Sequence, residues 1–155
     1  MDRSIIDRYE AGAEVPARAI VGLTPAQLDA HPIQGTWSIR QIIVHLLESE
    51  LAAIHRMRRI AGEERPLLIS YDESALASNL LYEREDLRAV TDLFADLRRW
   101  HAAWLRRMPD GAFDRKGVHN QRGLVGLGEM VGMYVDHLEH HMKFVHEKKV
   151  LLGVS

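Results

Sequence analysis

The sequence predicts an all-α fold, a four-helix bundle with long connections and one or two short extra helices. Four segments carry apolar residues at helical spacing. Alanine, leucine, arginine and glutamate dominate them, and runs of β-branched residues are scarce. Glycine and proline mark most of the boundaries between them. With 155 residues the chain can bury a sizeable core, so we expect a single domain over residues 1–155.

The first helix is expected from Asp2 to Val21. Pro16 should bend or interrupt it, because proline cannot donate the helical hydrogen bond. A short helix is expected after Thr24 and Pro25, since threonine is a good N-cap and proline fits the first helical position.

The second long helix should start after Ser38 as its N-cap and end near Gly62. Its apolar residues recur every three or four positions: Ile39, Ile42, Ile43, Leu46, Leu47, Ile54, Met57 and Ile60. Residues 65–84 form a long connection, with a helical turn from Asp72 to Leu80. Connections of this length are too long for a minimal up-down-up-down bundle.

The third long helix is expected over 85–108, where Pro109 stops it, and the fourth over 126–147. The expected buried face of the third helix consists of Leu87, Val90, Leu93, Phe94, Leu97, Trp100, Trp104 and Leu105. Arg98 is expected on a solvated helix face, paired with nearby acids, and His101 is expected to be solvated because it lies among arginines.

Composition excludes several classes of protein. The net charge of −2 argues against a general binder of nucleic acid or of anionic membranes. No apolar run approaches the roughly 18 residues of a membrane span, and the N-terminus lacks the apolar centre of a signal peptide. Because cysteine is absent, a cytoplasmic protein is expected, and any metal ion must be held by His, Asp or Glu.

His137 and His141 are the most informative pair in the chain, since residues four apart project from the same helix face. That face also carries Met130, Met133, Tyr134 and Phe144, so it should point into the core. Buried imidazoles need partners, and a metal ion would provide one. The alternative is two buried histidines that bond to their surroundings. His140 lies about 60° away from the pair by helix geometry.

A catalytic metal site usually has a third protein ligand and an open position. His45 is the candidate, on a small polar stripe with Ser38, Gln41, Ser49 and Ala52 that could line a pocket or form a solvated edge. His119, in the loop before the fourth helix, could approach the same pocket. The metalloprotease, di-iron, P-loop, dinucleotide and nucleophile-elbow patterns are all missing from the sequence.

Several segments together resemble the DinB/YfiT-like family. The stretch from Trp37 to Glu50 resembles its second-helix signature, and the stretch from Asp136 to His141 resembles its fourth-helix signature, H-x-x-H-H. Residues 8–12, 23–28 and 119–129 also fit, so the resemblance covers nearly the whole chain. Glu48 stands where aspartate is frequent in the family, and Glu50 where YfiT-like members often carry histidine.

The resemblance implies a DinB-like bundle with a divalent metal ion, zinc or nickel among others, held by His45, His137 and His141. It implies a small-molecule substrate. Characterised family members include transferases that use low-molecular-weight thiols and a thiol-dependent isomerase. Many members are homodimers, and an apolar remainder on the first or third helix could pair two chains here.

The leading expectation is a metal-dependent enzyme, either a hydrolase that uses a metal-bound water or a thiol S-transferase that binds a thiolate. Glu48 and Asp136 are candidates for a general base or for orienting a ligand, and Tyr134 for a hydrogen-bond donor. Two alternatives stay open: a non-catalytic metal-binding or sensor module, and a purely structural bundle.

Overall fold

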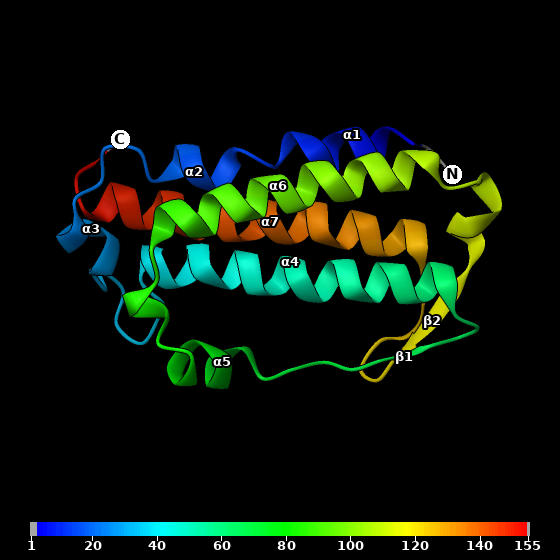
Figure 1. Cartoon of the computed structure of the whole chain (residues 1–155). Helices are drawn as coiled ribbons and strands as arrows, with labels where there is room; N and C mark the ends of the chain where they lie inside the picture. Colours follow the sequence, from blue (N-terminus) through cyan, green and yellow to red (C-terminus); the bar gives the residue numbers. More distant parts are fainter. Residues whose placement is uncertain (1–2, 155) are drawn as a thin grey trace.

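Four helical rods surround the core, and α1 and α2 together form one of them (Figure 1). Their bounds are α1 (Ser4–Ala11), α2 (Val15–Ala19), α4 (Ile39–Gly62), α6 (Leu87–Arg107) and α7 (Leu127–Leu151). The computed structural model describes residues 3–154, so the expected helix start at Asp2 lies outside the described residues. Because α4 and α1 each contact both α6 and α7, the rods occupy the corners of a square. The predicted four-helix bundle is confirmed.

The order of directions in the bundle is unusual, because α4 and α6 run the same way (Figure 1). The segment between them must therefore return along the whole length of the bundle. It carries β1 (Leu67–Leu68), α5 (Glu73–Asn79) and the 3₁₀ helix η1 (Tyr82–Arg84). This crossover accounts for the long connection in the sequence.

The first expected helix is two helices, because the chain turns at residues 12–14. Gly12 packs so closely on α6 and α7 that a Cβ atom would lie 2.4 Å from Nη1 of Arg98 and 2.7 Å from Cδ2 of Leu138. Pro16 then lies in the first turn of α2, where its missing N–H costs little.

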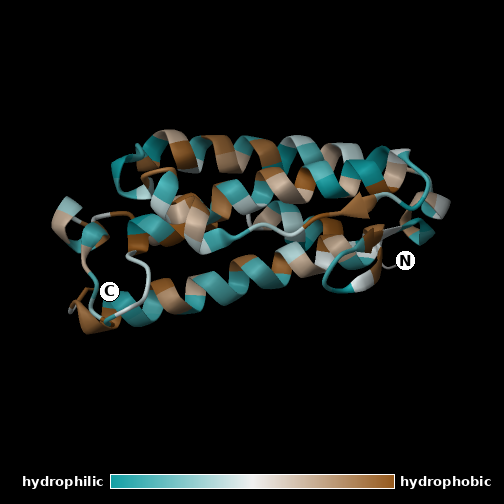
Figure 2. Ribbon diagram, turned by 90° about the horizontal axis from the view of Figure 1, so that it is seen from below, coloured by the Kyte–Doolittle hydropathy of each residue, from teal (hydrophilic) through white to brown (hydrophobic). Residues whose placement is uncertain are grey.

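The expected caps are present. The Ser38 and Gln41 side chains form a capping box at the start of α4, and Thr24 and Gln27 form another at α3 (Pro25–Asp29). Along each helix, hydrophobic and hydrophilic residues alternate in patches, as expected when one face is buried (Figure 2).

A small sheet, which the sequence did not predict, lies near the end of the bundle where α4 ends and α7 begins (Figure 1). The 3₁₀ helix η2 (Asp110–Asp114) precedes β2 (Lys116–His119) in the chain. β2 pairs in parallel with β1 and antiparallel with β3 (Gly123–Gly126). Strands of two to four residues are too short to show a period of two. Gly123, with φ of 75°, closes the hairpin in a conformation that glycine adopts without strain.

The expected buried face of α6 was partly wrong. Leu93 and Trp100 are about half exposed, at 47% and 51%, whereas Arg98 and His101 are buried. Arg98 can be buried because its guanidinium donates to the Glu50 carboxylate and to two backbone carbonyls. Within residues 3–154, no helix has both the length and the apolar character needed to cross a bilayer.

Candidate metal centre

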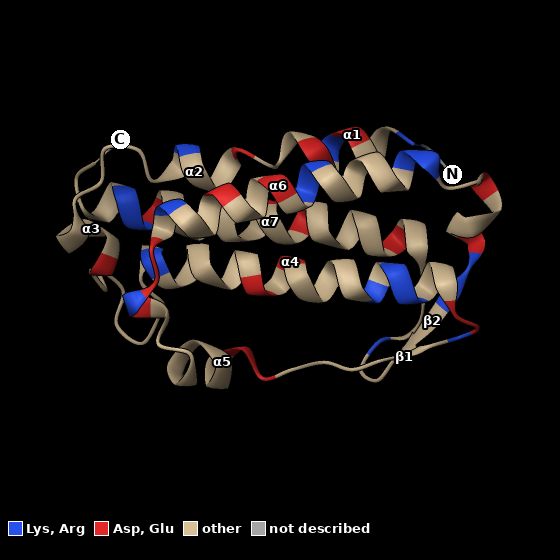
Figure 3. Ribbon diagram, viewed as in Figure 1, with Lys and Arg blue, Asp and Glu red and all other residues tan. Residues whose placement is uncertain are grey.

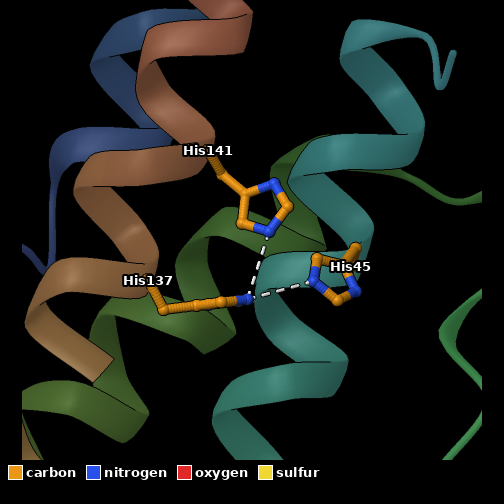
Figure 4. Close-up of side chains that lie close together, drawn as sticks. All are labelled: His45, His137 and His141. Carbon is orange, nitrogen blue, oxygen red and sulfur yellow. Dashed lines mark hydrogen bonds between the residues drawn. The ribbon is translucent and has the colours of Figure 1, made fainter. Parts of the chain in front are cut away.

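Three histidines from two helices meet at one point inside the bundle (Figure 4). Nε2 of His137 lies 3.2 Å from Nε2 of His45 and 3.1 Å from Nε2 of His141. One nitrogen from each ring lies within 4.8 Å of the others. The structure thus brings together the three residues that the sequence and the family resemblance indicated, here called the histidine triad.

Helix geometry explains the convergence. His137 and His141 are one turn apart on α7, and His45 faces them from α4. His45 is fully buried, and the other two are half-buried. The Trp37 ring, just before α4, covers the cluster with its centroid 4.8 Å from that of His45. Phe144, expected on the same buried face, is 41% exposed, and its ring packs against that of His140 with 4.8 Å between the centroids.

The environment keeps the triad neutral. Burial lowers the pKa of His45 and His141 to about 4 and that of His137 to about 3. The charge of a protonated neighbour adds to the effect: His141 acts on His45 and His137, and His140 acts on His141. At neutral pH each ring therefore has one N–H and one lone pair. Neutral imidazole is the form that binds a metal ion.

The nitrogen positions fit a metal ion. A tetrahedral zinc ion with zinc–nitrogen distances of 2.0–2.1 Å would place its ligand nitrogens about 3.3 Å apart. The two Nε2 separations at His137 are close to this value. Nδ1 of His45 and of His141 is buried and has no hydrogen-bond partner among residues 3–154. Protons on these Nδ1 atoms would leave both Nε2 lone pairs facing the shared point.

A pocket of about 420 Å³ opens beside the triad, with His137 in its wall. α4 contributes Ser49 and Arg56, and α7 contributes residues from Met130 to His140. The crossover covers one side with Ser70, Tyr71 and Glu73, and the β2–β3 hairpin supplies His119, Gln121 and Arg122. Ser49 lies in direct reach of the triad, with its Oγ 3.5 Å from Nδ1 of His137. The pocket is large enough for a small molecule.

The other sequence-predicted site residues fall in different places. Asp136 and Tyr134 line the pocket, and Tyr134 accepts a hydrogen bond of 3.0 Å from Nη1 of Arg56. Burial raises the pKa of Tyr134, so its hydroxyl stays protonated. Glu48 does not line the pocket; it lies near Tyr82, whose pKa is raised by burial and further by the negative charge of Glu48. His119 and His140, whose roles the sequence left open, both line the pocket.

Sequence reasoning missed Glu73, whose carboxylate lies 4.0 Å from Nε2 of His45. Burial raises its pKa. Glu73 belongs to the first turn of α5, and only the path of the crossover brings it to the triad. No spacing rule links a residue in such a connection to a histidine 28 positions earlier in the chain.

Comparison with known proteins places the chain among proteins of the same architecture. The chain is 30% identical over 146 residues to YfiT of Bacillus subtilis, provisionally named a metal-dependent hydrolase, with 92% of this chain and 82% of that protein covered. A Bacillus pumilus protein with the same provisional name is 33% identical over 143 residues, covering 87% of this chain and 79% of the relative.

Solved structures agree with this. The structure of Bacillus subtilis YfiT, described as having an unusual four-helix-bundle topology, superposes with a TM-score of 0.92 at 27% identity, covering 98% of this chain and 87% of that one. A mycothiol-dependent maleylpyruvate isomerase shares the fold, with a TM-score of 0.70 at 17% identity and coverage of 90% and 58%. The model of the DinB superfamily matches residues 9–145, and the chain belongs to this superfamily.

Proposed function

We propose that this protein is a metal-dependent enzyme in which His45, His137 and His141 hold one divalent ion, zinc or nickel, at the wall of the pocket. The observation that carries the proposal is the convergence of three neutral imidazoles beside a pocket that can hold a small molecule. The provisional names of the relatives support metal dependence and hydrolysis.

When bound, the ion would supply a water of lowered pKa or a bound thiolate as the nucleophile. The residues of the chain position the reactants. Ser49, within 3.5 Å of Nδ1 of His137, restrains the orientation of that ring. Tyr134, protonated and fixed by Arg56, can donate a hydrogen bond to a substrate oxygen. Glu73 and Asp136 are the carboxylates available in the pocket for proton transfer.

Thiol S-transfer is the second candidate, and a second pocket favours it. This pocket, of about 430 Å³, is more apolar and is lined by Trp37, Phe144 and His141. Since His137 lines one pocket and His141 the other, two reactants could reach the triad from different sides. A hydrolase needs only one organic substrate, whereas a transferase needs two, so the second pocket is the feature that favours S-transfer over hydrolysis.

Metal analysis tests the proposal first. Purified protein, stripped with chelator and titrated with Zn²⁺ or Ni²⁺, should bind about one ion per chain. His45→Ala and His141→Ala should each weaken binding by at least tenfold. His55→Ala is the matched control, because His55 is an exposed histidine of the same helix, and its affinity should equal that of the wild type.

The reaction class is tested on the loaded protein. Turnover of esters or amides without added thiol would favour a hydrolase, and turnover of an electrophile that needs a thiol would favour a transferase. If the two triad variants retain the metal ion as tightly as the wild type, the proposed centre is in the wrong place. If the loaded protein turns over neither class, a non-catalytic metal-binding module becomes the better description.

A further inference from the structure

One part of the wall of the pocket beside the triad is basic, and Glu73 and Asp136 give the same pocket two carboxylates. Arg56, Arg122 and His119 all line it. Among residues 3–154, neither arginine has a carboxylate oxygen within 4.0 Å. In Figure 3 the basic residues of α4 gather toward its two ends, with the larger group at the end next to the strands. The pocket thus contains cationic groups that the protein does not neutralise by direct ion pairs.

Arg56 is held rigidly in this wall. Its Nη1 donates to the hydroxyl of Tyr134, and its Nη2 donates to the carbonyl of Ile69 at 2.6 Å. Its guanidinium carbon also lies 5.4 Å from the centroid of the Tyr71 ring. Both hydrogen-bond acceptors are neutral, so they fix the planar group without cancelling its charge. A guanidinium has five N–H donors, which leaves donors for a ligand.

The pKa of His119 is affected by the charges in this wall. Burial lowers its pKa first, and the positive charges of Arg56 and Arg122 lower it further. The neutral ring adds a hydrogen-bonding group to the pocket without adding a third charge.

The pocket joins this wall to the triad. The ring centroids of Tyr134 and His137 are 5.8 Å apart, and the Tyr134 hydroxyl contacts Arg56. One aromatic ring thus separates the guanidinium from the triad. Arg56 follows His45 by 11 residues on α4, about 16 Å along the helix axis, and long helical side chains lean back toward the N-terminus. A small molecule can therefore span the two groups.

We infer that Arg56, assisted by Arg122, binds an anionic group of the substrate, a carboxylate or a phosphate, while the reacting bond lies at the triad. Arginine matches both groups by donating two parallel hydrogen bonds. The first half of the inference, anion binding, stands on the pocket alone. The second half, the placement of the reacting bond, rests on the proposed function.

Binding of simple anions to metal-free protein tests the inference, because removal of the metal prevents an anion from binding to the ion itself. Inorganic phosphate and succinate are titrated separately by calorimetry. We expect saturable binding of at least one of them to wild-type protein, weakened at least tenfold in Arg56→Gln. In Arg122→Gln we expect a loss of about threefold, because Arg122 is exposed.

Two further variants make the result specific. Arg107→Gln removes one charge from an exposed position at the end of α6 and should bind the anions as the wild type does. Arg56→Lys keeps the charge but loses the planar fork, so its affinity should lie between those of wild type and Arg56→Gln. If circular dichroism shows that Arg56→Gln does not fold, Arg122→Gln and Arg56→Lys still decide the outcome.

The inference is overturned if neither anion binds to wild-type protein at 50 mM, or if the Arg56 and Arg122 variants bind as tightly as the wild type. Phosphate binding alone would assign a phosphate-bearing substrate, and succinate binding alone a carboxylate-bearing one. Failure of metal binding with retained anion binding would remove the proposed function but leave this site. Failure of anion binding with an intact metal centre would remove this anion site but leave the proposed function.

Discussion

The buried ion pair between Arg98 and Glu50 gives the strongest stability prediction. Both side chains are 1% exposed, and Nε of Arg98 lies 3.0 Å from Oε2 of Glu50. The other guanidinium nitrogens donate to the carbonyls of Tyr9 and Tyr134. Arg98→Met should fill similar space but leave the Glu50 carboxylate buried without its cation. Such a loss costs about 3–5 kcal/mol, a large part of the total stability of a small domain.

Urea unfolding at pH 8, followed by circular dichroism, measures this cost. Arg99→Met is the matched control, because the neighbouring Arg99 is half-exposed and its ion pair with Glu14 lies at the surface, so its loss should cost about 1 kcal/mol or less. The double variant Arg98→Met/Glu50→Leu should recover part of the loss, since it removes both charges but leaves the buried Tyr9 hydroxyl without its Glu50 acceptor. The reasoning fails if Arg98→Met and Arg99→Met are equally stable.

Three smaller perturbations follow from the same structure. Burial lowers the pKa of His101 to about 3, so below pH 6.5 the unfolded state binds a proton at this residue that the native state does not bind. The free energy of unfolding therefore falls as the pH is lowered. His101→Phe should reduce this slope by up to about 1.4 kcal/mol per pH unit, measured by urea unfolding at pH 4–7. Ser38→Ala removes the capping side chain of α4 and should cost about 1 kcal/mol in thermal unfolding. Gly117→Ala should cost about 1–3 kcal/mol by urea unfolding, because the new Cβ atom would lie 2.8 Å from Cδ1 of Leu68; Gly111→Ala, with open space around it, should cost less than about 0.5 kcal/mol.

The helices could be predicted because each has a periodic apolar face and a recognisable start. α4 begins after Ser38 as expected, and α7 extends to Leu151, four residues beyond the expected end. The strands could not be predicted, because pairing between distant segments defines them: Leu68 of β1 pairs in parallel with His119 of β2. At the break after α1, Gly12 packs closely against α6 and α7, a tertiary contact that no local pattern encodes.

The candidate site likewise has residues that the sequence identified and contacts that only the fold reveals. Spacing alone singled out His137 and His141, and the small polar stripe together with the family resemblance singled out His45. Their meeting point required the fold. Arg98, expected on a solvated face, is buried because Glu50 from another helix neutralises it. Glu73 reaches the triad only through the path of the crossover. Sequence patterns thus identify groups on one helix face, whereas pairs across elements need the tertiary structure.

The low pKa values of the triad make a final prediction about metal binding. At pH 5 a histidine with the ordinary pKa of 6.5 is neutral in only about 3% of molecules. Three such ligands would all be neutral in a fraction of about 3 × 10⁻⁵ of the molecules, so the site would bind metal about 10⁴-fold more weakly than at pH 7. With pKa values of about 4, 3 and 4, His45, His137 and His141 are neutral together in about 80% of molecules at pH 5. Zinc affinity measured by calorimetry should therefore change by less than about threefold between pH 7 and pH 5, with circular dichroism verifying that the fold persists. A loss of a hundredfold or more would mean that the rings protonate as exposed histidines do, and that burial does not prepare them to bind a metal ion.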